Sequence, residues 1–442
     1  MRLQLSKVAR LNDRSGLNAT LAAAACALLE TSASAATDEP RPWSFDTGLL
    51  YYGESDDRVQ DISAAISAQR DFDEDRKLSL NLTADTLTGA SASGTTSLDR
   101  AQTFTSPSGK AIYSTPAGKV PLDDTFKDTR FALSGTWTQP LARVYTVSGG
   151  LGFSTEYDYT HIGANASLAR DFNKRNTTLS FGAAYSQDDI QPVGGAPLPL
   201  SQMLDVGDLS NKRNDDTKQV LDLLLGFTQV LGRNTLLRVN YSYSDSSGYL
   251  NDPYKLLSVV DPVTGDTIGR VAAGSQGPNG IYRYESRPDS RTKQGVYAEM
   301  KHAFGAPVLQ LSYRFMTDDW GIDSNTLETK LRWPLGDDNY IEPQLRYYTQ
   351  SEADFYRSSV VANQPLPQYA SADFRLGNFD AVTLGVKFGH RTASGNEWST
   401  RLEYYQQSGD VPASQIIGRQ ATREQYPDLS AVIVQFGYRF GL

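Results

Sequence analysis

The sequence is poor in the side chains on which thiol and metal chemistry depend. Its 442 residues include one cysteine, Cys26, and three histidines, His161, His302 and His390. Cys26 lies in a segment that we expect to be removed during export, which would leave no thiol and no disulfide framework. No Ser or Asp stands at a spacing that fixes a triad, so we expect isolated polar or interfacial histidines. We therefore predict no catalytic residue, no metal site, no cofactor and no enzymatic activity.

Long apolar runs are also missing. Beyond the N-terminus no stretch approaches the roughly 18 apolar residues of a transmembrane helix, and the mean hydropathy is -0.44. A helical membrane protein is excluded, whereas a transmembrane β-barrel is not, because half of each barrel strand faces water. The formal net charge of -9 argues against nucleic acid as a partner.

The N-terminus has the three-part pattern of a secretory signal peptide. A basic stretch up to Arg14 precedes the apolar segment 17–29, and Ala-Ser-Ala at 33–35 offers a cleavage site. The apolar segment is too short to cross a bilayer. We predict that residues 1–35 are cleaved and that residues 36–442 form a single barrel domain.

Alternation of apolar and polar residues dominates the mature chain. Leu179, Phe181, Ala183 and Tyr185, for example, alternate with small or polar residues. Repeated over segments of about ten residues, this pattern is typical of barrel strands with one face toward lipid and one toward the lumen. We predict an all-β fold, a transmembrane antiparallel up-and-down barrel of about 16 strands within a range of 14–18. The predicted strands are 43–53, 59–70, 77–88, 129–139, 144–155, 161–171, 177–188, 218–230, 235–245, 291–303, 308–317, 325–334, 340–350, 380–390, 397–407 and 431–441.

Short and long connections alternate strictly along this list. A barrel with periplasmic turns and extracellular loops requires this arrangement, whereas a soluble sandwich does not. Both chain ends fall on the side of the short turns. The long loops, all expected to be extracellular, are about 89–128, 189–217, 246–290, 351–379 and 408–430.

The last strand carries an aromatic-rich apolar face. Its alternate positions include Phe436, Tyr438, Phe440 and Leu442. Outer-membrane barrels finish on an amphipathic, aromatic-rich strand. We therefore predict a C-terminal assembly signal that the barrel-assembly machinery reads, and a location in the outer membrane of a Gram-negative bacterium.

Charged residues gather on the predicted lumen face of the later strands. One interpretation is a polar pore or binding channel whose Arg-rich wall faces anionic or amphipathic solutes. The other is a ladder of ion pairs that stiffens the barrel, and both can hold together. The predicted ladder consists of Glu299, Arg314, Glu328, Arg332, Glu342, Arg346, Lys387, Arg401, Glu403 and Arg439.

Carboxylates also gather at the outer rim, among them Asp123, Asp124 and Asp128. Their oxygens are ligands that Ca²⁺ accepts. None of these clusters follows the spacing of an EF-hand loop, and solvated loop charges and turn-forming Asp are the simpler interpretation. The sequence leaves both interpretations open.

Several short segments carry a resemblance to a known family. They include Tyr51-Tyr52-Gly53-Glu54, the stretch 192–197 (Pro-Val-Gly-Gly-Ala-Pro) and Asp318-Asp319-Trp320-Gly321. On these segments the chain resembles the proteobacterial family catalogued as domain of unknown function 3570, over nearly all of the mature sequence. The resemblance implies an outer-membrane β-barrel-like fold and implies no activity.

These observations favour a porin-like channel or a solute-binding barrel with a partly charged lumen. The alternative is a structural or partner-binding barrel of an envelope redox or export assembly, with a plugged lumen. An outer-membrane hydrolase is a third hypothesis. The expected partners are outer-membrane lipid and lipopolysaccharide, the barrel-assembly machinery and small solutes.

Overall fold

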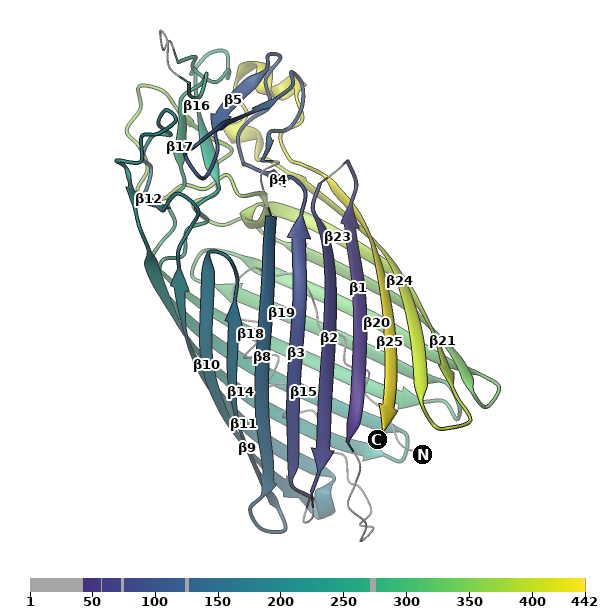
Figure 1. Cartoon of the computed structure of the whole chain (residues 1–442). Coiled ribbons are helices and arrows are strands. Elements are labelled where there is room, and N and C mark those ends of the chain that lie inside the picture. The colour runs from purple at the N-terminus through teal and green to yellow at the C-terminus, as the bar shows by residue number, and fades with distance from the viewer. Residues whose placement is uncertain (1–42, 57, 73–74, 124–126, 271–275, 442) are drawn as a thin grey trace.

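The computed structural model describes residues 43–441, with gaps at 57, 73–74, 124–126 and 271–275. Sixteen antiparallel strands form one closed barrel, which confirms the predicted fold class (Figure 1). The predicted signal peptide lies outside the described residues.

Each predicted strand corresponds to an observed one. Several observed strands extend further at the end of the barrel that carries the long loops, which we call the outer end. The barrel closes because β1 pairs with β25, with Gly48 opposite Gly437. In their order around the barrel the strands are β1 (Ser44–Glu54), β2 (Gln60–Asp71), β3 (Lys77–Thr88), β8 (Lys127–Pro140), β9 (Tyr145–Thr155), β10 (Tyr159–Phe172), β11 (Thr177–Ile190), β14 (Asp216–Gly232), β15 (Thr235–Gly248), β18 (Ser290–Ala303), β19 (Val308–Asp318), β20 (Asp323–Leu335), β21 (Asn339–Gln350), β23 (Asn378–Arg391), β24 (Glu397–Asp410) and β25 (Leu429–Gly441).

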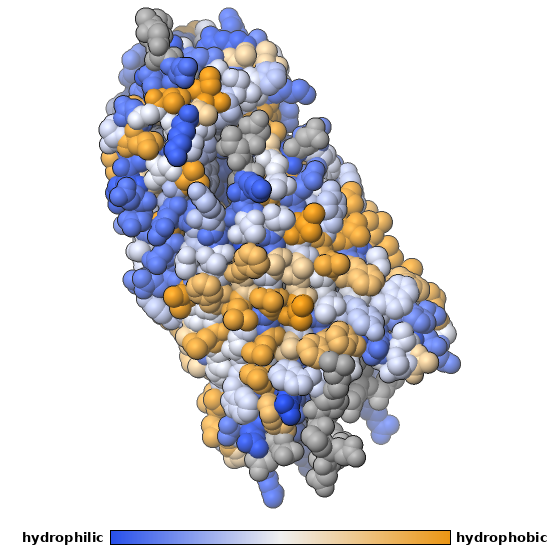
Figure 2. All heavy atoms as spheres, in the orientation of Figure 1, coloured by the Kyte–Doolittle hydropathy of each residue, from blue (hydrophilic) through white to orange (hydrophobic). Residues whose placement is uncertain are grey.

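The alternation of the sequence becomes an alternation of exposure. On β14, Leu221 and Leu225 are exposed on the outside, whereas Val220, Asp222 and Leu224 are buried on the inside. Exposed apolar residues on neighbouring strands form a belt around the barrel, and the outer end is mostly hydrophilic (Figure 2). This distribution is that of an outer-membrane-type barrel, with lipid outside and polar groups within.

Both described chain ends lie at the end of the barrel that carries the short turns (Figure 1). Gly336 in the turn between β20 and β21 has a φ of 73°, a conformation that glycine adopts without steric cost. The described residues contain four short 3-10 helices: η2 (Asn173–Arg175), η3 (Phe374–Leu376), η4 (Ala413–Gln415) and η5 (Gly418–Thr422). No helix in these residues has the length and apolar character needed to cross a membrane.

The five long loops join into a folded layer, which we call the cap. It consists of the loops between β3 and β8, β11 and β14, β15 and β18, β21 and β23, and β24 and β25. Its small sheets pair β4 (Ser91–Ala92) with β7 (Leu122–Asp123), β5 (Gln102–Thr105) with β6 (Ile112–Thr115), β12 (Ala196–Pro197) with β13 (Lys212–Arg213), and β16 (Leu256–Val260) with both β17 (Tyr282–Tyr284) and β22 (Ser359–Val361).

The cap has its own apolar cores. One contains Phe104, Met203, Leu256 and Tyr282, which come from three different loops. The loops leave the rim at widely separated strands, yet the Leu256 amide donates to the Ser93 carbonyl at 2.8 Å. The loops therefore meet above the outer end of the barrel. From the sequence alone, these segments are predicted only as connections between strands.

Candidate functional site

The lumen face of β18–β24 carries most of the charged residues of the predicted ladder. On β21, Glu342 and Gln350 are buried inside, whereas Leu345 and Tyr347 are exposed outside. The same alternation places Arg346 on the lumen face, half-buried. The predicted ladder residues of these strands therefore share the interior.

Arg401 contacts two carboxylates and one amide on this face. Its Nη2 lies 2.8 Å from Glu342 Oε1, and its Nη1 lies 3.5 Å from Glu403 Oε1. Nη1 also donates to the Gln344 side chain. In the strand register Lys387 lies between Glu342 and Arg401, so two cations and two carboxylates share one patch of wall. All four side chains are buried, which makes each charge dependent on its neighbours.

Glu299 organises a second group on β15 and β18. Arg238 Nη1 lies 3.5 Å and Lys301 Nζ lies 3.8 Å from Glu299 Oε1. Oε2 of the same carboxylate accepts hydrogen bonds from Tyr297 Oη at 2.9 Å and Gln310 Nε2 at 2.8 Å. Both carboxylate oxygens are thus satisfied within the wall.

Two other ladder residues have acidic partners outside the predicted list. Arg332 lies over the Tyr340 ring, with 3.6 Å from its guanidinium carbon to the ring centre. Its Nη2 is 3.9 Å from Glu397. Arg439 pairs with Asp46 on β1 at 2.7 Å.

Glu328 and Arg314, the last two residues of the predicted ladder, also face the lumen. Glu328 pairs with Lys330 on its own strand at 2.9 Å. Arg314 is exposed on the lumen side, with its guanidinium carbon 5.6 Å from the Tyr297 ring centre. The contacts named above form local clusters along the lumen wall.

The opposite wall holds a buried polar cluster that the sequence pattern did not indicate. His161, Asp188 and Lys218 lie side by side on β10, β11 and β14. His161 Nδ1 is 2.6 Å and Lys218 Nζ is 2.9 Å from the Asp188 carboxylate, to which Tyr159 also donates. The expectation of an isolated His161 is therefore wrong, because Asp188 is its cross-strand neighbour and not its neighbour in sequence.

The other two histidines have neutral partners. His302 Nδ1 lies 2.8 Å from Thr235 Oγ1, and His390 Nδ1 lies 2.9 Å from Asn339 Oδ1. Both lie near the short-turn end. His161 Nε2 is buried without a hydrogen-bond partner among the described residues.

A buried ionic network ties two loops of the cap together. Arg287 reaches Glu285 at 2.6 Å and Asp373 at 2.9 Å, and Arg375 reaches Asp373 and Asp252 at 2.5 Å each. Burial acts to raise the pKa of Asp373, but Arg375, Lys255 and Arg287 outweigh it and hold that pKa below its usual range. Burial raises the pKa of Glu285, since Arg287 offsets only part of the cost.

Three carboxylates at the outer end of β8–β10 could hold a divalent cation. Asp128, Glu156 and Asp158 each offer an oxygen, and these atoms lie within 4.8 Å of one another. Oxygen donors of this kind suit Ca²⁺ or Mg²⁺. Burial and the hydrogen bond and charge of Asp128 raise the pKa of Glu156 to about 8.

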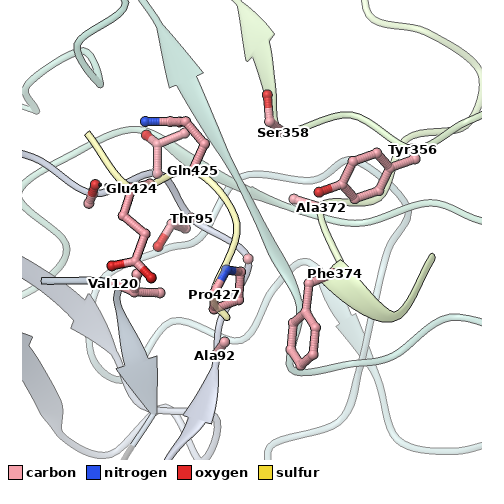
Figure 3. Close-up of a pocket in the computed structure, with 13 residues that line it drawn as sticks. Ala92, Thr95, Val120, Tyr356, Ser358, Ala372, Phe374, Glu424, Gln425 and Pro427 are labelled. Atoms are coloured by element: carbon pink, nitrogen blue, oxygen red, sulfur yellow. Dashed lines mark hydrogen bonds between the residues drawn. The ribbon is translucent and has the colours of Figure 1, made fainter. Parts of the chain in front are cut away.

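A pocket opens at the seam between three loops of the cap. Figure 3 shows Tyr356 and Phe374 on one side of it and Glu424 and Gln425 on the other. Small residues, including Ala92, complete the lining. The seam is therefore a place where the loops are packed less closely than in the apolar cores.

Comparison with known proteins identifies the family. A family model described as "Protein of unknown function (DUF3570)" matches residues 18–440. The chain belongs to the DUF3570 family. No curated protein matches the sequence.

Solved structures similar to this DUF3570 protein include two receptors and a secretin. A mutant of the ferric enterobactin receptor PfeA from Pseudomonas aeruginosa has a TM-score of 0.41 and 10% identity, covering 84% of this chain and 54% of that chain. The siderophore receptor PirA from Acinetobacter baumannii has a TM-score of 0.39 and 10% identity, with coverage of 84% and 54%. A bacterial polysaccharide outer membrane secretin has a TM-score of 0.42 and 9% identity, with coverage of 92% and 100%. The chain thus spans about half the length of the two receptors.

The predicted assembly signal of the DUF3570 chain lies on β25. Phe436 is exposed on the outside, and Phe440 stacks between Phe45 and Tyr438, with ring centres 5.1 Å and 5.4 Å away. Leu442 lies outside the described residues. The aromatic face predicted from alternation is therefore continuous with β1 across the closure of the barrel.

Proposed function

We propose that this DUF3570 protein lies in the outer membrane of a Gram-negative bacterium and acts as a porin-like channel or solute-binding barrel. The observation that carries the proposal is that the ion pairs of the lumen run along its wall and do not span it. The pairs named above lie within one strand or join strands no more than three positions apart around the barrel, and they do not cross to the opposite wall. A barrel of sixteen strands with its charges neutralised along the wall has room for an aqueous path.

The exposed apolar belt supports contact with outer-membrane lipid and lipopolysaccharide. A cleaved signal peptide and assembly through the C-terminal strand belong to the same proposal. Small solutes would pass along or bind to the charged wall, and the cap would control their entry at the outer end. The proposal includes no catalytic step, no cofactor and no contact with nucleic acid.

Single-channel recording with the purified full-length protein in planar bilayers tests the channel. We expect discrete conductance steps in wild type. Arg314→Glu should shift the reversal potential in a salt gradient toward cations, because Arg314 is exposed inside the lumen. Arg233→Glu, in an exposed short turn, is the matched control and should cause a smaller shift. A folded barrel with no conductance would refute the channel.

The cap supports a second candidate, a barrel with a closed lumen that serves as a structural or partner-binding element. Its loops are packed around apolar cores and a buried ionic network. This candidate predicts no conductance in wild type and none in variants with a loosened cap. Recording from an Arg287→Gln variant therefore separates the two, since a gated channel should conduct more in this variant.

A further inference from the structure

Four tyrosines on the lumen face share one pattern. Each of the four donates its phenol hydrogen to a carboxylate or amide two residues further along the same strand. The four pairs, with their oxygen–oxygen distances, are Tyr52–Glu54 at 2.8 Å, Tyr297–Glu299 at 2.9 Å, Tyr348–Gln350 at 2.6 Å and Tyr405–Gln407 at 2.6 Å. Because these hydrogen bonds run along the strand, they hold the phenol groups against the wall.

Two of these tyrosines lie near Arg346. In the register of β21, β23 and β24, Arg346 is opposite Thr383 and Thr383 is opposite Tyr405. Tyr348 is opposite Ala381 in the next row toward the cap. The backbones of Arg346 and Tyr405 are thus two strand spacings, about 10 Å, apart, with only small side chains between them. Arg346, Tyr348 and Tyr405 are all half-buried on the lumen side.

Hydrogen bonds to the cap fix the two amides that accept from Tyr348 and Tyr405. Gln350 Nε2 donates to the carbonyls of Arg375 at 2.9 Å and Gly377 at 2.8 Å. Gln407 Nε2 donates to Tyr426 Oη at 3.0 Å, and Tyr426 donates in turn to the Phe374 carbonyl at 3.0 Å. Each amide accepts from its tyrosine and donates to the cap. The two rings are therefore oriented before any solute arrives, which lowers the entropic cost of binding.

The surrounding wall carries an excess of positive charge. On β18–β24 the lumen-facing cations outnumber the lumen-facing carboxylates, although the whole chain has a net charge of -9. The cations are Arg291, Lys293, Lys301, Arg314, Lys330, Arg332, Arg346, Lys387 and Arg401. The carboxylates are Glu299, Asp318, Glu328, Glu342, Glu397 and Glu403. A wall of this composition attracts anions from the bulk solution.

We propose that Arg346, Tyr348 and Tyr405 form a binding site for small aromatic carboxylates beneath the cap. The inference rests on the proposed function, because it names the class of solute for that lumen. The guanidinium of Arg346 supplies charge-assisted hydrogen bonds to the carboxylate. The two tyrosine rings supply faces on which an aromatic solute stacks. A solute that lacks either the negative charge or the aromatic ring loses one of these contributions.

Three probes of similar size separate the contributions of charge and ring. Benzoate has both features, cyclohexanecarboxylate has the charge without the ring, and benzylammonium has the ring with the opposite charge. Binding is measured by saturation-transfer NMR and titration of the full-length protein in detergent micelles, without reference to conductance. We expect benzoate to bind at least about fivefold more tightly than either analogue, as one lost stacking or ionic contact implies.

Matched variants locate the site. Tyr405→Leu should weaken benzoate about fivefold, whereas Tyr404→Leu, which removes the exposed neighbouring ring on the outer face, should not change it. Tyr405→Phe retains the ring and should bind benzoate much better than Tyr405→Leu. Arg346→Gln should weaken benzoate about tenfold with little effect on benzylammonium. Heat-modifiable migration of each variant shows that the barrel has folded.

The outcomes distinguish this inference from the proposed function. Equal affinity for the three probes, or unchanged benzoate binding in both Tyr405→Leu and Arg346→Gln, overturns the site even if the barrel conducts. Selective benzoate binding that both variants weaken supports the site even if the bilayer recordings show no pore, in which case only the channel is refuted.

Discussion

Arg401 Nη2 lies 2.8 Å from Glu342 Oε1, although β23 separates their two strands. The side chains are 3% and 8% exposed, so neither charge is hydrated by bulk water. Arg401 also reaches Glu403 at 3.5 Å. One guanidinium therefore contacts two carboxylates on the lumen wall, and Lys387, which lies between Glu342 and Arg401 in the strand register, supplies the second positive charge.

Removal of this guanidinium should destabilise the barrel. Arg401→Leu leaves Glu342 and Glu403 buried with less compensation, and the loss of one partner of a buried pair costs about 3–5 kcal/mol. Urea titration of the protein in lipid bilayers, followed by heat-modifiable migration, measures the free energy of unfolding. Asp46→Asn is the control, because its pair with Arg439 is 49% and 34% exposed and contributes at most about 1 kcal/mol. Equal effects of the two substitutions would contradict the assignment.

The carboxylate cluster of Asp128, Glu156 and Asp158 should make stability depend on pH. The pKa of Glu156 is raised to about 8 by burial and by Asp128, so the folded protein keeps a proton that the unfolded chain releases near pH 4.5. Stability should therefore fall as the pH rises from about 4.5 through 8. Glu156→Gln should flatten the profile across this window, as measured by thermal unfolding at several pH values. A wild-type profile that rises across the same window would disprove the assignment.

The ionic network of the cap should keep the loops closed. Arg287→Gln leaves Glu285 and Asp373 with less positive charge nearby, and this should loosen the loop between β21 and β23. We expect faster cleavage of this loop when intact cells are treated with protease. Arg270→Gln, which breaks a more exposed pair with Asp205, should change the cleavage rate much less. Resistance equal to wild type in both variants would argue against a closing role.

The two ends of the barrel should lie on opposite sides of the membrane. A cysteine at Val263, 78% exposed in the cap, should react with a membrane-impermeant maleimide on intact cells. A cysteine at Lys174, exposed in a short turn, should react only after the cells are broken. The native Cys26 does not interfere if the signal peptide is removed. The reverse labelling pattern would invert the topology.

The outer face of β25 should direct assembly. Phe440→Asp places a charge at the membrane interface, where the folding cost is only about 0–1 kcal/mol. Impaired recognition by the assembly machinery should therefore dominate, with low levels of folded barrel in the membrane fraction. Gln435→Asp, on the lumen face of the same strand, is the control and should assemble normally. Normal heat-modifiable Phe440→Asp protein would remove the basis for the signal.

The sequence by itself determined the strands and their two faces. Successive side chains of a strand point to opposite sides, so a run such as Leu179 to Tyr185 specifies both the element and its lipid face. The order of short and long connections assigned the two ends of the barrel in the same local way. The lumen location of Arg346 and Arg401 followed from the same period of two.

Only the tertiary structure decided which residues meet. His161 meets Asp188, and Arg401 meets Glu342, because strands pair in a particular register and the barrel closes with a particular stagger. The alternation within one strand does not specify which residues of the neighbouring strand lie opposite it. The cap could not be predicted either, since β16 and β22 pair although about a hundred residues separate them, and long loops with only very short strands carry no periodic signal. Contacts of this kind depend on the summed packing of distant segments, which a local pattern does not contain.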